Sequence, residues 1–242
     1  MKVIEFKLND LLDDINGKKD KQKAIIFARF FKTGKGQYGE GDIFLGINVP
    51  DQRQLARKYI SLEFVDLEAL LQSKVHEHRL IALLILVDKY RNPNGNNRKA
   101  IFDFYLKNIK SVNNWDLVDL SADKIIGAYL MDKNKSLLFN LARSESLWER
   151  RVSIISTFHF IRNRKFDDAL KISEILLNDR HDLIHKAVGW MLRETGKRDL
   201  QSETGFLDKF HKTMPRTMLR YAIEKFEIKN CYEKIIYKPL SL

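Results

Sequence analysis

The sequence has 242 residues, of which 44% are hydrophobic and 31% are charged, and it carries a formal net charge of +11. This balance indicates a folded protein whose positive charge favours a polyanionic partner, either nucleic acid or an anionic membrane. The sequence lacks an apolar run of about 18 residues and an apolar signal segment at its start, so we expect a cytoplasmic protein without a membrane span. The single cysteine, Cys231, excludes an internal disulfide and a cysteine-clustered zinc site.

Helix-forming residues dominate the chain, whereas alternating runs of β-branched residues are scarce. Leu, Ile, Ala, Lys, Arg and Glu in this proportion predict an all-α fold. The expected helices lie at residues 9–16, 20–32, 51–60, 63–72, 76–91, 97–108, 113–130, 134–142, 146–161, 167–177, 182–196, 199–209 and 215–227.

The expected helices form pairs joined by short polar turns, such as residues 91–97. The pairs recur at about 35–45 residues, which is the spacing of HEAT-type repeats. A single pair cannot bury its apolar stripe, so stacked pairs share a core and leave a curved surface. No linker divides the chain, and we therefore expect residues 1–242 to form one α-solenoid domain with a C-terminal tail at 229–242.

Residues 33–50 are an exception, because several glycines crowd into this segment before Pro50. The simpler interpretation is a long surface loop between the second and third helices. The alternative is a mobile flap near a substrate.

An aromatic residue and a carboxylate share one face of the helix expected at 113–130. Trp115 and Asp119 are four residues apart, so their side chains should project side by side. A π surface beside an anionic oxygen suits a cationic, planar ligand. Asn113 is the expected N-cap, and Asp116 completes a pattern like a capping box. The structural alternatives are core packing for Trp115 and a salt bridge between repeats for Asp119.

The helix expected at 146–161 begins with Trp148 and Arg151, three residues apart. Two arginines in its first turn oppose the helix dipole, which suggests an external anion such as a phosphate, or Asp119 on a neighbouring repeat. A basic cluster follows this helix and is either a solvated helix end or a DNA contact; it contains Arg162, Arg164 and Lys165.

Further aromatic and basic residues follow toward the C-terminus. Trp190 and Arg193 share a helix face, and Gly189 would let another backbone approach closely beside Trp190, although glycine costs about 1 kcal/mol in mid-helix. Arg216, near the start of the last expected helix, suits a phosphate contact or a solvated basic edge.

Signatures of common cofactor sites are missing from the sequence. His181 and His185 are four residues apart but have no third ligand nearby, so we expect no metal site. The sequence also lacks a P-loop, a dinucleotide fingerprint, an HExxH motif and a nucleophile elbow.

Four segments together resemble the bacterial DNA alkylation repair protein family, the AlkD-type alkylpurine DNA glycosylases. They are NNWDLVDLSA (113–122), LWERRVSI (147–154), HKAVGWMLRETGK (185–197) and MPRTMLRYAIEKF (214–226). Weaker similarity is found in GINVPDQRQLARKY (46–59) and HEHRLIALLIL (76–86). The resemblance thus spans residues from about 40 to 228.

The resemblance implies HEAT-like repeats that form a basic concave groove for double-stranded DNA. It implies hydrolysis of the N-glycosidic bond of N3- and N7-alkylated purines, without a deep base-flipping pocket and without a cofactor. We expect such a protein to act as a monomer, associated with the bacterial nucleoid when bound to DNA. The competing interpretation is a non-catalytic HEAT-repeat protein that binds DNA structure or a protein partner.

The resemblance also assigns roles to individual residues. Asp119 matches the catalytic aspartate, with Trp115 one turn before it. Arg151 matches the active-site arginine that follows the Trp148 pattern, and Trp190 matches a second aromatic wall. The resemblance places Arg193, Arg162, Arg164 and Lys165 near the DNA backbone. Arg216 is expected to join them because of its own position near the start of the last helix.

Overall fold

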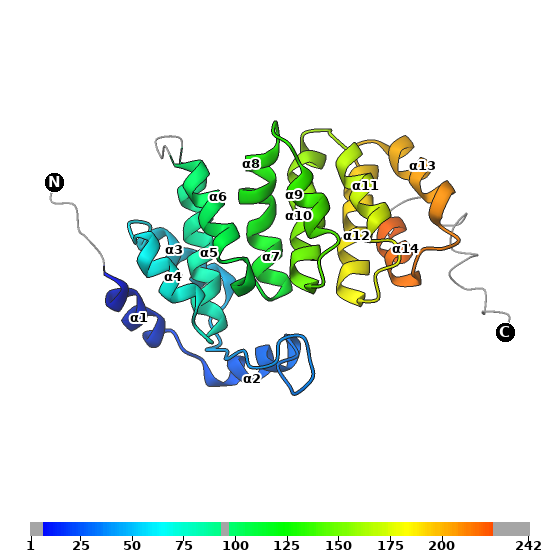
Figure 1. Cartoon of the computed structure of the whole chain (residues 1–242). Helices are drawn as coiled ribbons and strands as arrows, with labels where there is room; N and C mark the ends of the chain where they lie inside the picture. Colours follow the sequence, from blue (N-terminus) through cyan, green and yellow to red (C-terminus); the bar gives the residue numbers. More distant parts are fainter. Residues whose placement is uncertain (1–6, 93–96, 225–242) are drawn as a thin grey trace. The chain divides into compact units, whose positions relative to one another are not determined.

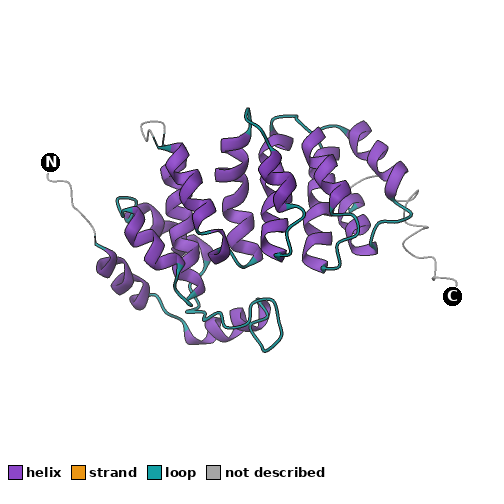
Figure 2. Ribbon diagram, in the orientation of Figure 1, coloured by secondary structure: helices purple, strands orange, loops and turns teal. Residues whose placement is uncertain are grey.

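The computed structural model describes residues 7–92 and 97–224 (Figure 1). The tail expected at 229–242, together with Cys231, lies outside the described residues. Every regular element in the described part is a helix, and the ribbon diagram shows no strand there (Figure 2). The all-α prediction is therefore confirmed for this part of the chain. The chain divides into two compact units, residues 1–121 and residues 122–242.

In the described part of the first unit, six α-helices precede the helix that carries Trp115. Its elements are α1 (Leu8–Gly17), α2 (Lys21–Phe30), α3 (Val49–Lys58), α4 (Phe64–Leu71), α5 (His76–Arg91), α6 (Arg98–Lys107), the short 3₁₀ turn η1 (Ile109–Ser111) and α7 (Trp115–Ala122), which ends at the boundary between the units.

Helix α5 is the central helix of the first unit. All residues from Arg79 to Val87 are buried, because the run is apolar around the whole helix and α3, α4 and α6 pack against it. Helix α2 differs, since none of its residues is buried and Ile25, Ile26 and Phe30 are exposed. Asp20 caps α2 by accepting hydrogen bonds from the amides of the first turn.

The second unit is also helical throughout its described residues. Its elements are the π-helical turn η2 (Asp123–Gly127), α8 (Ala128–Leu130), α9 (Ser136–Leu141), α10 (Leu147–Arg162), α11 (Asp167–Ile175), α12 (Asp182–Gly196), α13 (Leu200–Phe210) and α14 (Arg216–Ile223).

Helix α10 has the central place in the second unit. Its residues from Arg151 to Thr157 are all buried, and η2, α9, α11 and α12 pack around it. The helix expected at 113–130 is interrupted by the π turn η2, which the sequence pattern did not predict. A Cβ at Gly127 would clash with the backbone oxygen of Ser156, so this glycine permits the close packing of η2 on α10.

No helix within the described residues is long and apolar enough to cross a bilayer.

Candidate functional site

Trp115 and Asp119 lie on α7, one helical turn apart, and both are half-buried. The helix begins at Trp115, two residues later than expected, and the backbone amide of Trp115 donates to Asn114 Oδ1 at 2.8 Å. The expected N-cap role of Asn113 is therefore wrong, and Asn113 Oδ1 has no hydrogen-bond partner among the described residues. Asn114, not Asn113, directly precedes the first helical residue.

A continuous aromatic stack supports one face of Trp115. The indole lies nearly parallel to the ring of Phe31, with centroids 5.1 Å apart and an interplanar angle of 12°. Phe44 stacks on Phe31 at 4.8 Å, and His76 stacks on Phe44 at 4.4 Å. Phe30 meets Trp115 edge-on at 5.8 Å. These contacts fix the plane of the indole, and they cover the face that is turned toward Phe31.

Trp115 also lines a pocket of about 450 Å³ in the first unit. Its walls are largely apolar and aromatic, and they come from α2, the loop that follows it, α3, α5 and α7. Gln52 is a polar exception, because its Oε1 is buried and has no hydrogen-bond partner among the described residues, whereas its Nε2 donates to the Ile47 carbonyl at 2.6 Å. The pocket is therefore an apolar space with one unused acceptor.

A buried charge network lies behind the aromatic stack. His76 bridges two carboxylates, with Nδ1 3.1 Å from Asp42 Oδ2 and Nε2 2.8 Å from Asp116 Oδ2. Arg79 donates to the other oxygen of Asp42 at 2.7 Å. Ionised carboxylates only accept hydrogen bonds, so both ring nitrogens must donate and His76 is an imidazolium in this arrangement.

The pKa values in this network agree with that assignment. Burial alone would lower the pKa of His76, but the hydrogen bond and charge of Asp116 outweigh it and raise the value above its usual range. Burial would likewise raise the pKa of Asp42, but the hydrogen bond from His76 and the charge of Arg79 outweigh it and lower the value. Both shifts favour the charged forms of His76 and Asp42, and the hydrogen bond from His76 holds Asp116, the residue next to Trp115.

The glycine-rich segment is anchored to α5 by its second half. The carboxylate of Glu77 accepts hydrogen bonds from three consecutive backbone amides, those of residues 45–47. Gly46 has a φ of +85°, and a Cβ there would lie 2.7 Å from the amide nitrogen of Ala24, so only glycine fits. This anchoring places Phe44 in the stack and Asp42 beside His76. Asn48 then caps α3, which begins before Pro50.

In the second unit, Arg151 is buried in the first turns of α10. Its Nη1 donates to the carbonyl oxygen of Leu183 on α12 at 2.5 Å, so the side chain reaches across to the neighbouring helix. Trp148 lies one turn earlier on α10 and is half-buried. The neighbouring Arg150 is occupied by Asp179, with Nε 2.6 Å from the carboxylate. At this helix start, Arg150 therefore pairs with a carboxylate, and one nitrogen of Arg151 donates to the α12 backbone.

Trp190 and Arg193 lie on α12, three residues apart, and both are half-buried. Trp190 contacts Phe158 of α10, with ring centroids 5.6 Å apart. Arg193 forms an ion pair with Glu224 at the end of α14. A Cβ at Gly189 would lie 2.5 Å from Tyr221 Cβ and would clash with the Met218 carbonyl oxygen. The close backbone approach that the sequence predicted for Gly189 is thus confirmed, and the approaching element is α14.

The basic cluster after α10 is only partly free to bind an external anion. Arg162 pairs with the buried carboxylate of Asp123 and lies over the ring of Phe158 at 4.6 Å. Lys165 pairs with Asp132 at 2.9 Å. Arg164 is exposed and has a φ of +59° in the turn.

Arg216 is exposed at the first position of α14, directly after Pro215. Its position in the first turn matches the expectation of a basic residue at the start of the last helix.

The two histidines considered for a metal site have local structural partners. The backbone amide of Leu183 donates to His181 Nδ1 at 3.2 Å, so His181 caps α12. His185 Nε2 donates to the carbonyl oxygen of Asp179. Within residues 7–92 and 97–224, no cluster of three or more His, Cys, Asp or Glu side chains could hold a metal ion.

Sequence reasoning missed the residues that support Trp115, namely Phe31, Phe44, Asp42 and His76. Asp42 and His76 are 34 positions apart, and no local period connects them. The sequence held one signal for this network. His76 and Glu77 begin a helix that then becomes apolar for two turns, and polar side chains next to such a buried segment need hydrogen-bond partners.

Comparisons with known proteins agree on one family. A family model described as "DNA alkylation repair enzyme" matches residues 11–226. Among solved structures, the chain is similar to one described as a "Predicted DNA alkylation repair enzyme from Enterococcus faecalis", with 17% sequence identity and a TM-score of 0.67. The likeness covers 87% of this chain and 97% of that chain, and at this identity it extends to the fold alone. A search among curated proteins finds no match.

Proposed function

The chain belongs to the DNA alkylation repair enzyme family, and we propose that it excises N3- and N7-alkylated purines from duplex DNA by hydrolysing their N-glycosidic bonds. In this proposal, residues 1–242 act as one DNA-binding domain whose HEAT-like helical pairs present a basic groove. The matched region, 11–226, includes every residue that we assign to the site. The net charge of +11 supports a polyanionic substrate.

The observation that carries the proposal is the pair on α7. Trp115 is held in a fixed plane by the stack on Phe31, and Asp119 lies one turn further on the same helix. A carboxylate on the same helix as an aromatic ring that is held in place suits a site where positive charge develops during the reaction. A charge that is already in place needs little rearrangement in the transition state.

Alkylation at N3 or N7 makes the purine cationic and therefore a good leaving group. As the bond between C1′ and the base nitrogen stretches, positive charge moves onto the sugar as an oxocarbenium ion. We assign Asp119 to stabilise that charge and to orient or deprotonate the attacking water. The water oxygen then bonds to C1′, the base leaves with the bonding electrons, and Asp119 accepts the proton of the water.

The remaining residues act on the sugar and the backbone in this proposal. Trp115 and Trp190 contact the deoxyribose and its neighbours through their electron-rich ring faces. For Trp115 the available face is the one not covered by Phe31. Arg151 anchors a phosphate of the damaged strand, and the partners proposed for the flanking backbone are Trp148, Arg193, Arg162, Arg164, Lys165 and Arg216.

The intramolecular pairs of several proposed DNA contacts favour a second candidate function. Arg193 is engaged with Glu224 and Arg162 with Asp123, so both would have to exchange a carboxylate for a phosphate. A family member that binds DNA structure without catalysis could keep some of these ion pairs, because it does not need every one of these arginines to contact a phosphate. This candidate predicts binding to undamaged or branched DNA and no abasic product.

A single assay separates the two candidates. Methylated duplex DNA is incubated with excess protein, and released 7-methylguanine and 3-methyladenine are measured by chromatography. The proposed glycosylase releases methylpurines at a rate above spontaneous depurination and leaves abasic sites. Binding with release at only the spontaneous rate supports the non-catalytic candidate instead.

A further inference from the structure

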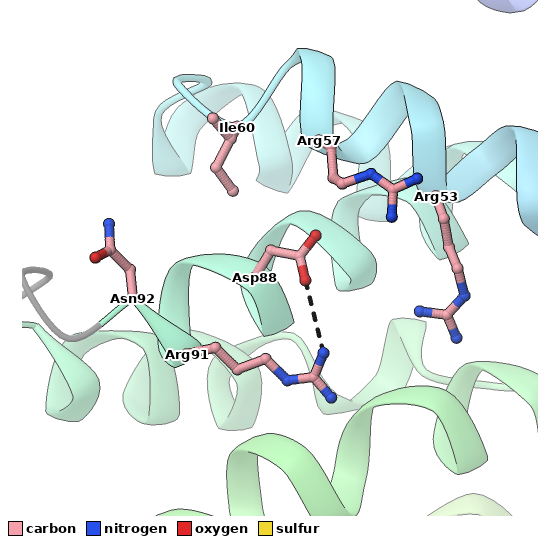
Figure 3. A pocket seen from close by; sticks show the side chains of 6 residues that line it. All are labelled: Arg53, Arg57, Ile60, Asp88, Arg91 and Asn92. Atoms are coloured by element: carbon pink, nitrogen blue, oxygen red, sulfur yellow. Dashed lines mark ion pairs between the residues drawn. The ribbon is translucent and has the colours of Figure 1, made fainter.

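A group of arginines on α3 and α5 is separate from every residue that we assigned to the reaction. Arg53 and Arg57 lie one turn apart on α3, and Arg91 lies at the end of α5. Together with Asp88, these side chains line a pocket of about 400 Å³. Figure 3 shows Asp88 with Arg57 above it, Arg91 below it and Arg53 to its right. The pocket therefore has three cations and one anion on its walls.

These cations are poorly compensated within the chain. Among the residues that the structure describes, neither Arg53 nor Arg57 has a hydrogen bond, an ion pair or a ring contact. Arg91 approaches Asp88 at 3.9 Å, which is too long for a hydrogen bond. The formal charge of the four side chains is +2, and Arg57 and Arg91 are exposed to solvent. The group therefore attracts an external anion.

A purely structural reason covers only part of the group. Cations near the C-terminus of a helix interact favourably with its dipole, which accounts for Arg57 in the last turn of α3 and Arg91 in the last turn of α5. Arg53 lies in the middle of α3, where this effect has faded. It is half-buried and lines the pocket, and no dipole effect accounts for its charge there.

The chemistry of the group indicates its ligand. Guanidinium groups present forked donors that match two oxygens of a phosphate at once, and three of them surround one space here. A volume of about 400 Å³ is large enough for a tetrahedral phosphate with its ester neighbours.

We propose that Arg53, Arg57 and Arg91 form a phosphate clamp that holds one or two backbone phosphodiesters of duplex DNA. This inference rests on the proposed function, because it takes DNA as the partner, but it concerns affinity and not catalysis. The clamp binds through charge and geometry, so it does not distinguish damaged from intact DNA.

The test compares the full-length protein with Arg53→Ala/Arg57→Ala on undamaged duplex DNA, with binding measured as a function of salt. A second variant, Arg53→Lys/Arg57→Lys, keeps the charge and loses the forked geometry. Lys171→Ala/Lys212→Ala removes two exposed charges elsewhere and serves as the matched control. Unchanged melting temperatures establish that all variants are folded.

We expect the alanine pair to weaken duplex binding roughly 10- to 30-fold near 0.15 M salt and to lower the salt slope by about 2. The lysine pair should recover the slope and only part of the affinity. Binding and slope equal to those of the Lys171/Lys212 control would overturn the clamp. A second result would also overturn it. If inorganic phosphate raised the melting temperature of the wild type but not of the alanine pair, while both bound duplex DNA equally, the site would bind a free anion and not the DNA backbone.

Base release by the same proteins at saturating concentration keeps the two proposals apart. A working clamp predicts that the alanine pair excises at the wild-type rate once it is bound. If the wild type releases no base, the proposed glycosylase activity is wrong. The salt dependence of duplex binding would still show whether the clamp exists.

Discussion

The indole ring of Trp115 lies parallel to the phenyl ring of Phe31, with their centroids 5.1 Å apart. Phe31 directly follows α2, a helix without a buried residue. The orientation of a proposed substrate-binding residue on α7 therefore depends on a segment more than 80 positions earlier in the chain. A ligand cannot meet the face of Trp115 that Phe31 covers, so the sugar of a damaged nucleotide must meet the opposite face or the edge.

Replacing Phe31 with Leu tests this dependence. The substitution removes the ring stack but keeps an apolar side chain, so we expect a stability loss of about 1–3 kcal/mol and a base-excision rate lowered by roughly 10-fold. Phe64→Leu is the matched control, because Phe64 stacks on Phe104 in the same unit with centroids 4.7 Å apart. Single-turnover excision measures the effect, and equal rates in the two variants would show that the stack does not position Trp115.

Replacing His76 with Gln tests the charge network that holds Asp116. The variant leaves Asp42 and Asp116 buried without their shared cation, so we expect a loss of about 3–5 kcal/mol at pH 6. The folded-state pKa of His76 is raised above 6.5, so its contribution to stability is complete below pH 6.5 and is lost as pH rises through the folded value.

Urea unfolding at pH 6 and pH 9 checks this sign. The stability difference between wild type and His76→Gln should shrink at the higher pH. His78→Gln on the same helix is the control, because burial lowers the pKa of His78 and the opposite trend is expected there. A difference that stays constant or grows with pH would contradict the imidazolium assignment.

Glu203 gives a second pH prediction, in the other unit. It is fully buried, and both carboxyl oxygens lack a hydrogen-bond partner among the described residues. Burial raises the pKa of Glu203 to about 9, although the charge of Arg193 acts in the opposite direction. The stability that this group contributes is complete below pH 4.5 and is lost as pH rises toward 9.

Glu203→Gln should therefore flatten the decline of stability between pH 5 and pH 8. Each pH unit in this range costs the wild type about 1.4 kcal/mol, so over three units it should lose roughly 4 kcal/mol more than the variant. Glu174→Gln, an exposed carboxylate, serves as the control. Parallel stability curves for Glu203→Gln and wild type would show that Glu203 is ionised in the folded protein.

Gly189 permits a prediction about packing beside Trp190. An added methyl group would meet the backbone of α14 at Met218 and Tyr221, so Gly189→Ala should destabilise the protein by about 2–3 kcal/mol despite the better helix propensity of alanine. Gly205→Ala is the matched control, since a Cβ there meets nothing within 4 Å and should stabilise α13 by about 0.5–1 kcal/mol. Thermal unfolding measures both, and a stabilised Gly189→Ala would contradict the close approach of α12 and α14.

Local pattern was sufficient to predict several features of this protein. The apolar run of α5 and the helix-forming composition predicted the all-α fold, and the four-residue spacing of Trp115 and Asp119 placed them on one helix. Gly189 predicted a close backbone approach because a mid-helix glycine needs a reason.

The features that sequence reasoning missed depend on contacts between distant positions or on small differences in backbone energy. The bridge from Asp42 through His76 to Asp116 joins three elements, and no spacing reveals it. The π turn at 123–127 differs from an α-helix by a single shift of hydrogen-bond register, which leaves no clear mark in the residue pattern. The segment at 33–50 does connect α2 and α3 as expected, but its anchor, Glu77, lies about 30 residues away, so no local pattern indicated it.

The most direct test of the central proposal is the single-turnover release of 7-methylguanine by wild type and Asp119→Asn at saturating protein. We expect the variant to bind methylated duplex with an affinity within about threefold of wild type and to lose at least 100-fold in excision rate, because the neutral amide cannot stabilise the developing oxocarbenium charge. Release at the wild-type rate by Asp119→Asn would contradict the account.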